Sequence, residues 1–197
     1  SPKEIIDFRS LIDFFPKMKA VLVPVLWGEQ KSHCNALHIY LPKKSTTWIY
    51  FNLDVHIHDF KFWMAHELAH IKAIKLKGDE AEDFADQFAE ALLISQEQTE
   101  FIYNKIKGAN FYQQKEYILK YAEDMVISPS IVGCRLNRYA EHIGREKLKV
   151  NQHAMASDFN RQFNLLSNEI LSSDFNSRTY IKKCEELFKT PFFVTLK

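Results

Sequence analysis

The sequence lacks any apolar run long enough to cross a bilayer. Its longest nearly apolar stretch, Ala20 to Trp27, contains Pro24 and falls far short of the about 20 residues that a membrane helix needs. The first ten residues, SPKEIIDFRS, have neither the apolar core nor the cleavage pattern of a secretory signal. We therefore expect a chain that neither spans a membrane nor carries a signal peptide.

Paired cysteines are missing as well. The chain has three cysteines, Cys34, Cys134 and Cys184, and none of them has CxxC spacing. An odd number of widely separated cysteines argues against a disulfide framework and favours a reducing compartment. The sequence therefore predicts a cytoplasmic protein whose cysteines pack as small apolar side chains.

Neither sign of charge is in excess. The 26 lysines and arginines nearly balance the 25 aspartates and glutamates, and the formal net charge is +1. This balance offers no overall reason to expect nucleic-acid binding. A hydrophobic fraction of 46% in 197 residues is ordinary for a globular protein. The chain is long enough for one domain, or one domain with a small appendage.

The first part of the chain predicts one helix and a small sheet. Apolar residues at helical spacing over 4–15 indicate an amphipathic helix, which Pro16 should end. Three stretches rich in β-branched and aromatic residues follow, at 20–27, 36–42 and 46–53. Pro24 makes the first of them an edge strand or a bulged strand. A largely antiparallel sheet is the simplest interpretation.

The remainder of the chain is predicted to be mostly helical. Asp59 should cap a helix that runs to about Lys77 and stops at Gly78, and Asp79 should cap a second helix that ends near Ile94. Further helices are predicted at 114–125, 129–143, 157–171 and 177–189, with a closing strand at 191–196. Strands followed by helices predict an α+β fold. We divide it into a core over 1–110 and a helical region over 111–197 that packs on the core.

A metal-binding motif lies in the first of these helices. His66-Glu67-Leu68-Ala69-His70 fits HExxH, and residues four apart on a helix lie one above the other. Two imidazoles in this arrangement can bind one zinc ion, and Glu67 can act as general base on a water molecule bound in an open position. Burying His66, Glu67 and His70 in an apolar helix would cost free energy unless a partner such as a metal satisfied them.

A third ligand is needed for a catalytic site. The metzincin pattern requires Gly and His at positions 73 and 76, where this chain has Ala and Leu, so that class is excluded. Glu82 and Asp86 lie four apart on the next helix. In glutamate-type zincins a Glu at this spacing binds zinc and the Asp holds the far nitrogen of a ligand histidine. The alternative is that Glu82 forms a capping box with Asp79.

A segment over about 115–143 is similar to a helix-turn-helix. Ser128-Pro129 is a good helix start, but Val126 occupies a turn position that usually requires glycine. Arg135 and Arg138 could meet phosphates, yet acidic residues nearby partly offset their charge. We therefore expect a structural helix pair or a platform for substrate, and no DNA binding by this chain.

Other polar residues have no assigned position in the site. The histidines at 56 and 58 could suggest a second metal, although alternate positions in a loop are more typical of a helix entry. A donor that stabilises the transition-state oxyanion is also expected near the metal. The candidates are Tyr50, Tyr103, Tyr112 and His142.

The motif and its continuation resemble one family. HELAH followed by EDFADQFAEALL is similar to the HELxH and ExxANxFAxxLL segments of ImmA/IrrE metallopeptidases. The resemblance implies a zincin-like fold and a zinc-dependent endopeptidase with His66, His70 and Glu82 as ligands and Glu67 as catalytic residue. It also implies a protein substrate, a helix-turn-helix transcriptional repressor. The alternative is a non-catalytic zinc-containing sensor or interaction module of a transcription regulator, or of a toxin–antitoxin or phage-defence system.

Overall fold

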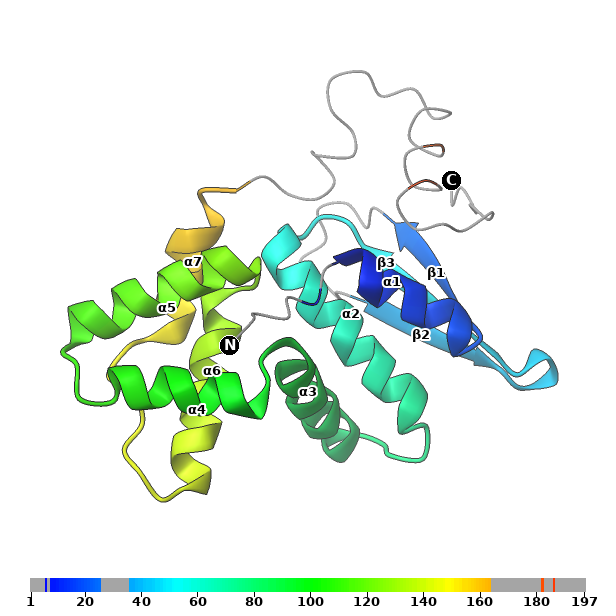
Figure 1. Cartoon of the computed structure of the whole chain (residues 1–197). Coiled ribbons are helices and arrows are strands. Elements are labelled where there is room, and N and C mark those ends of the chain that lie inside the picture. Colours follow the sequence, from blue (N-terminus) through cyan, green and yellow to red (C-terminus); the bar gives the residue numbers. More distant parts are fainter. Residues whose placement is uncertain (1–5, 7, 26–35, 164–181, 183–185, 187–197) are drawn as a thin grey trace.

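The computed structural model describes residues 6, 8–25, 36–163, 182 and 186. Over these residues the fold is mixed α+β, as predicted, with a small sheet and a majority of helix (Figure 1). The strands are β1 (Ala20–Val25), β2 (Ala36–Leu41) and β3 (Thr46–Asn52), and the helices are α1 (Phe8–Lys17), α2 (Ile57–Lys72), α3 (Asp79–Leu93), α4 (Gln96–Ile106), α5 (Phe111–Met125), α6 (Pro129–His142) and α7 (Gln152–Asn160). None of the helices in this part of the chain is both long and apolar enough to span a membrane.

The sheet is mixed, which corrects the prediction of a largely antiparallel sheet. Its order is β1-β3-β2, with β2 antiparallel and β1 parallel to β3. Consecutive strands do run in opposite directions, but β3 lies between β1 and β2 and therefore pairs with β1 in parallel. Strand order depends on tertiary packing, so local patterns do not reveal it. Pro24 lies in an edge strand, as predicted, where its missing N–H removes no bond of the sheet interior.

Helices α1 and α2 cover one face of the sheet. Ile49 and Phe51 of β3 point to this face and are fully buried. The Phe51 ring makes edge-to-face contacts with Phe15 of α1 and Phe60 of α2, at centroid distances of 6.0 and 5.4 Å. These aromatic contacts fix the first turns of α2 over the sheet, and the HExxH motif follows one to two turns later.

The boundaries of α1, α2 and α3 differ from the predicted ones. Pro16 lies inside the last turn of α1, which ends at Lys17. His56 precedes α2, so Asp59 lies in its first turn and is not its cap. The helix ends at Lys72, because Ile74 is 55% exposed and continuing the helix would bury little. Gly78 precedes α3 with φ 58°, a conformation that glycine adopts without strain.

The part of the chain after α3, called the helical half below, contains one helix that the sequence did not predict. α4 begins with a capping box in which Ser95 accepts from the Gln98 N–H and the Gln98 side chain accepts from the Ser95 N–H. The Ser-x-x-Gln pattern was a readable signal for it. Helices α5 and α6 match the predictions within three residues, and α7 starts earlier than predicted. Some predictions concern positions outside the described residues, namely the strand at 191–196, Cys34 and Cys184. Of the helix predicted at 177–189, only residues 182 and 186 are described.

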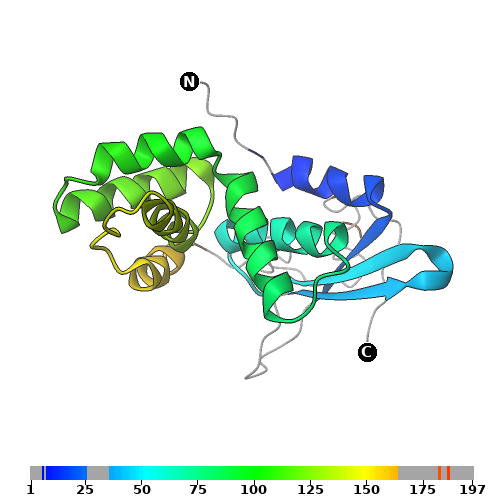
Figure 2. The ribbon, with the colours of Figure 1, turned by 90° about the horizontal axis from the view of Figure 1, so that it is seen from below.

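The helical half packs on the sheet half, which is the part of the chain from α1 to α3, as Figures 1 and 2 show. Lys61 of α2 donates from Nζ to the Met125 carbonyl at 2.7 Å, and the Ser128 N–H donates to the His58 carbonyl at 3.2 Å. One continuous hydrophobic cluster contains buried residues of both halves. The boundary predicted at residue 110 falls between α4 and α5, and the division into two regions stays a prediction.

Candidate metal centre

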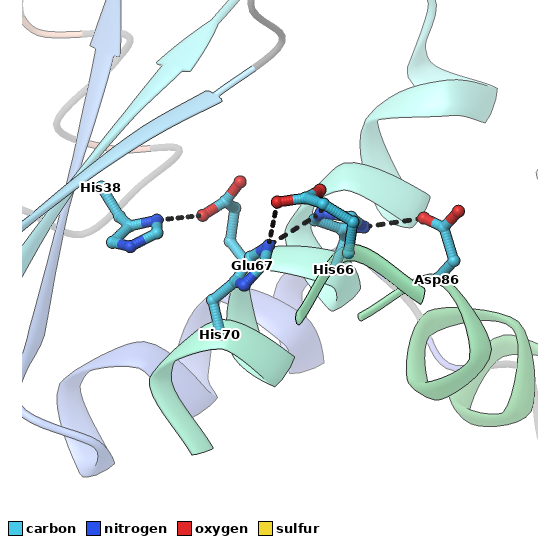
Figure 3. A network of polar contacts seen from close by, with 6 residues as sticks. His38, His66, Glu67, His70 and Asp86 are labelled. Carbon is cyan, nitrogen blue, oxygen red and sulfur yellow. Dashed lines mark hydrogen bonds and ion pairs between the residues drawn. The ribbon is translucent and has the colours of Figure 1, made fainter. Parts of the chain in front are cut away.

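Helix α2 brings the two histidines of the motif together. The Nε2 atoms of His66 and His70 are 3.0 Å apart, and Figure 3 shows the two rings meeting at these atoms. His66 is only 4% exposed. Two imidazole lone pairs repel each other at this distance unless a proton or a cation lies between them. His66, Glu67 and His70 together form a group that can hold a metal ion, with ligand atoms within 4.8 Å of one another.

Helix α3 adds a further carboxylate to the histidine pair. Glu82 Oε2 lies 3.2 Å from His66 Nε2, and its Oε1 lies 3.6 Å from His70 Nε2. Donor atoms about 2.1 Å from a tetrahedral zinc ion are about 3.4 Å apart, so the three separations suit one face of such a site. The predicted cap by Asp79 and its capping box with Glu82 are not observed, because Gly78 is the N-cap residue and Asp79 is the first residue of α3.

Glu67 faces a different neighbour. Its Oε2 lies 3.5 Å from Nδ1 of His38 on β2, which is an ion-pair distance and too long for a good hydrogen bond. Oε2 is buried and has no hydrogen-bond partner among the described residues. A buried carboxylate oxygen without a partner is costly. Glu67 therefore retains the capacity to accept a proton or bind a water molecule beside the histidines.

Asp86 supports His66 from behind. His66 Nδ1 donates to Asp86 Oδ1 at 2.9 Å (Figure 3). This bond fixes the ring and leaves Nε2 directed at His70 and Glu82. A carboxylate on the far nitrogen is the usual support of a metal-binding histidine. The spacing of α3 allows both contacts, because Glu82 and Asp86 lie one helical turn apart. Glu82 approaches Nε2 of the His66 ring and Asp86 binds its Nδ1.

The electrostatic surroundings push the two histidines in opposite directions. Burial lowers the pKa of His66, but the bond to Asp86 and the charges of Glu67, Asp86 and Glu82 outweigh it, so the pKa is raised. For His70, burial prevails and the pKa is lowered. The same negative surroundings that favour a proton on His66 favour a divalent cation between the rings.

His38 is the residue of this cluster that the sequence did not identify. It lies opposite Ile49 in the β2–β3 pair, so it points to the sheet face that α2 covers. Its ring stacks on His70 at a centroid distance of 5.3 Å, and its contact with Glu67 raises its pKa against the effect of burial. Only the register of β2 on β3 reveals this position, because the sequence shows His38 as one polar residue in an apolar strand.

The four candidates for an oxyanion donor lie elsewhere. Tyr50 follows Ile49 in β3 and so points to the opposite face of the sheet. Tyr103 donates from its hydroxyl to the Glu146 carbonyl, and Tyr112 is 79% exposed on α5. His142 is exposed at the end of α6. Among the described contacts of the cluster, none involves these residues.

The two histidines at the start of α2, His56 and His58, do not share a site. His56 is the residue before the helix. His58 is buried against the rings of Phe159 and Phe163, at centroid distances of 4.9 and 4.2 Å, and burial lowers its pKa. The helix-entry interpretation of this segment therefore fits the structure, and a second metal there does not.

A pocket of about 490 Å³ lies beside the cluster. It is bounded by the residues that lead into α2 and by α2, α3 and α6. Asp86 lines it and holds His66, and Trp63 lines it with its ring 5.5 Å from the His66 ring. Asp86 and Trp63 therefore line the pocket and also contact His66 of the candidate metal site.

The segment similar to a helix-turn-helix uses its arginines internally. Arg135 donates to Thr99 Oγ1 at 3.3 Å and to Gln96 Oε1 at 3.2 Å, both on α4. Arg138 pairs with the buried Glu90 of α3, with Nε 3.3 Å from Oε1. These contacts join α6 to α3 and α4, which is the structural role expected of the segment.

Compared with models of known protein families and with curated proteins, the chain matches none. The resemblance to ImmA/IrrE peptidases therefore depends on the residues of the motif and stays a prediction.

Proposed function

We propose that the chain is a zinc-dependent endopeptidase with a zincin-like core, in which His66, His70 and Glu82 bind the metal. The observation that carries this proposal is the convergence of both Nε2 atoms and the Glu82 carboxylate within 3.0 to 3.6 Å. Two imidazoles and one carboxylate suit zinc and make up the protein ligands of a catalytic site, which leaves one position for water or substrate.

Glu67 is proposed as the catalytic residue and not as the third ligand. Its carboxylate pairs with His38 on the sheet side, whereas Glu82 approaches both Nε2 atoms from α3. Zinc, when bound, lowers the pKa of a water ligand to about 7 and polarises the substrate carbonyl. The buried Oε2 of Glu67 then takes the proton of the attacking water and delivers it to the leaving amine. Asp86 keeps the His66 tautomer that presents Nε2 to the metal.

The edge strand β2 is proposed to bind the peptide in extended form. Among the described strands β2 pairs with β3 alone, so it forms an edge of the described sheet. Its exposed apolar side chains, Leu37, Ile39 and Tyr40, are between 43 and 47% exposed, and His38 in the same strand contacts Glu67. Main-chain hydrogen bonds to such an edge would hold a substrate across the metal.

The proposed substrate is a protein, namely a helix-turn-helix repressor, on the strength of the motif resemblance. We propose a cytoplasmic location, which the odd number of widely separated cysteines favours. The internal partners of Arg135 and Arg138 support the proposal that this chain itself does not bind DNA.

Metal analysis and cleavage assays test the proposed function. The purified chain should bind one zinc per molecule and cleave a combinatorial peptide library or a panel of helix-turn-helix proteins, and a chelator should stop cleavage. Glu67→Gln should keep zinc and lose about 10²- to 10⁴-fold in rate, while Glu80→Gln on the exposed side of α3 should match the wild type. Stoichiometric zinc without cleavage of any substrate would favour the non-catalytic alternative.

A further inference from the structure

The pocket beside the metal cluster has a strongly acidic wall. Its lining includes four carboxyl groups, those of Asp54, Asp59, Asp86 and Glu90, against one guanidinium, that of Arg138. Asp59 accepts from Asn160 Nδ2 at 2.8 Å and Asp86 accepts from His66. Within the described contacts, Glu90 pairs with Arg138 and Asp86 with His66, whereas Asp54 and Asp59 have no cationic partner. The local potential therefore favours a cationic guest.

Glu90 is the feature that marks the pocket as a binding site. It is only 3% exposed, yet it lines the pocket. One of its oxygens, Oε1, pairs with Arg138, while Oε2 is buried without a hydrogen-bond partner among the described residues. Burial raises the Glu90 pKa to about 7, although the charges of Arg138 and Arg135 oppose the shift. A donor that reaches this buried oxygen from the pocket would satisfy it and stabilise the carboxylate.

Two aromatic side chains complete the pocket. Phe62 and Trp63 of α2 line it, and their rings contact each other at a centroid distance of 5.2 Å. Aromatic faces next to carboxylates attract planar or tetrahedral nitrogen cations and cover their alkyl stems. An anionic guest would meet four carboxyl groups and only one guanidinium. The volume of about 490 Å³ is ample for a side chain or a small amine.

We propose that this pocket binds a guanidinium or alkylammonium group through Glu90, Asp54 and the Trp63 ring. Such a group has two sources: a basic side chain of the peptide substrate, or a free amine or guanidine. The first source rests on the proposed peptidase function and makes the pocket a specificity site beside His66. The second makes it a ligand site in contact with Asp86, the support of the same histidine.

The binding test uses small probes on the full zinc-loaded chain. n-Butylguanidinium and n-butylammonium should bind saturably and shift the NMR signals of the Trp63 indole, whereas neutral n-butylurea and anionic pentanoate should not. Glu90→Gln should weaken the binding of n-butylguanidinium about tenfold or more. Asp54→Asn, at a half-buried position outside α3, should also weaken it and serves if Glu90→Gln fails to fold. Asp83→Asn on the exposed side of α3 is the matched control.

The peptide arm identifies the source of the cation. In the library digest, a preference for Lys or Arg at one fixed position from the cleaved bond, reduced by Glu90→Gln but not by Asp83→Asn, establishes a substrate side chain. Binding of n-butylguanidinium without such a preference establishes a free ligand. If neither the library nor the helix-turn-helix proteins are cleaved, the proposed peptidase function is refuted, while the pocket is still judged by the small probes. Equal binding of n-butylurea, or binding unchanged in both Glu90→Gln and Asp54→Asn, overturns the proposal.

Discussion

Two helix pairs of this protein, α2–α3 and α5–α6, carry recognisable sequence motifs, and the polar side chains of the two motifs have different surroundings. In α2 and α3, His66, His70 and Glu82 converge, and Oε2 of Glu67 is buried without a hydrogen-bond partner among the described residues. In α5 and α6, Arg135 and Arg138 are engaged by side chains of α4 and α3. A motif is therefore a candidate site where its polar atoms can still bind a ligand. Where neighbouring helices already bind those atoms, the motif serves to hold the helices together.

The largest expected effect is the loss of zinc on removal of a ligand from the first pair. Glu82→Ala should weaken zinc binding by about 4 kcal/mol, or roughly 1,000-fold, because one of three protein ligands supplies about a third of a binding free energy of about 10–16 kcal/mol. Competition with a chromogenic chelator measures this change.

Glu67→Gln is the comparison variant for this measurement. It should retain nearly full zinc affinity, because Glu67 faces His38 and not the Nε2 atoms. If Glu67→Gln lost zinc while Glu82→Ala kept it, the two carboxylates would exchange roles and the proposed mechanism would be wrong.

A second prediction concerns the contact between the two helix pairs. The Glu90 pKa, raised by burial to about 7, lies above the ordinary value near 4.5. Between these two pH values the folded state holds a proton that the unfolded state has released. The free energy of unfolding should therefore fall as pH rises from about 4.5 to 7, by about 3 kcal/mol from this group, and stay lower above pH 7.

Urea unfolding of the wild type and Glu90→Gln at several pH values isolates this contribution. The variant should show a flatter pH dependence, because it cannot ionise at position 90, while all other ionisable groups are the same in both proteins. The charged groups around Glu90 are Arg138 and Arg135 from α6 and Asp86 from its own helix, and Asp54 and Asp59 also line the pocket. Parallel curves for wild type and variant would show that Glu90 is ionised throughout this range.

A third prediction concerns a variant that removes the carboxylate bound to His66 and leaves the proposed metal ligands unchanged. Asp86→Ala removes the acceptor of the His66 Nδ1–H bond and should lower zinc affinity about 10- to 100-fold. The same chelator competition measures it, with exposed Asp83→Ala on the same helix as control. An unchanged affinity would mean that packing alone orients the His66 ring.

The smallest effect is expected in the turn of the second helix pair. Val126 adopts φ 52° and ψ 53° at the end of α5, a left-handed conformation that costs a β-branched residue about 1–2 kcal/mol. Val126 is 37% exposed, so Val126→Gly loses little packing. We expect a gain of about 1 kcal/mol in the free energy of unfolding, measured in urea. Val126→Ala keeps the strain and should gain less.

Much of the candidate site could be predicted from the sequence because helix geometry relates spacing to position. Residues four apart lie on one face, which brings together His66 with His70 and Glu82 with Asp86. The fold class and most helices were also predictable from hydrophobic periodicity and helix caps. The missed α4 had a readable signal in its Ser95 capping box, whereas the end of α2 depended on the exposure of Ile74.

The sequence by itself determined that His66 lies beside His70 and Glu82 beside Asp86, since residues four apart share one face of any helix. Only the tertiary structure decided the strand order, the approach of His38 to Glu67, the internal use of Arg135 and Arg138, and the acidic pocket around Glu90. The physical reason is that these contacts join segments far apart in the chain. Their partners are selected by packing and burial, which no local pattern encodes.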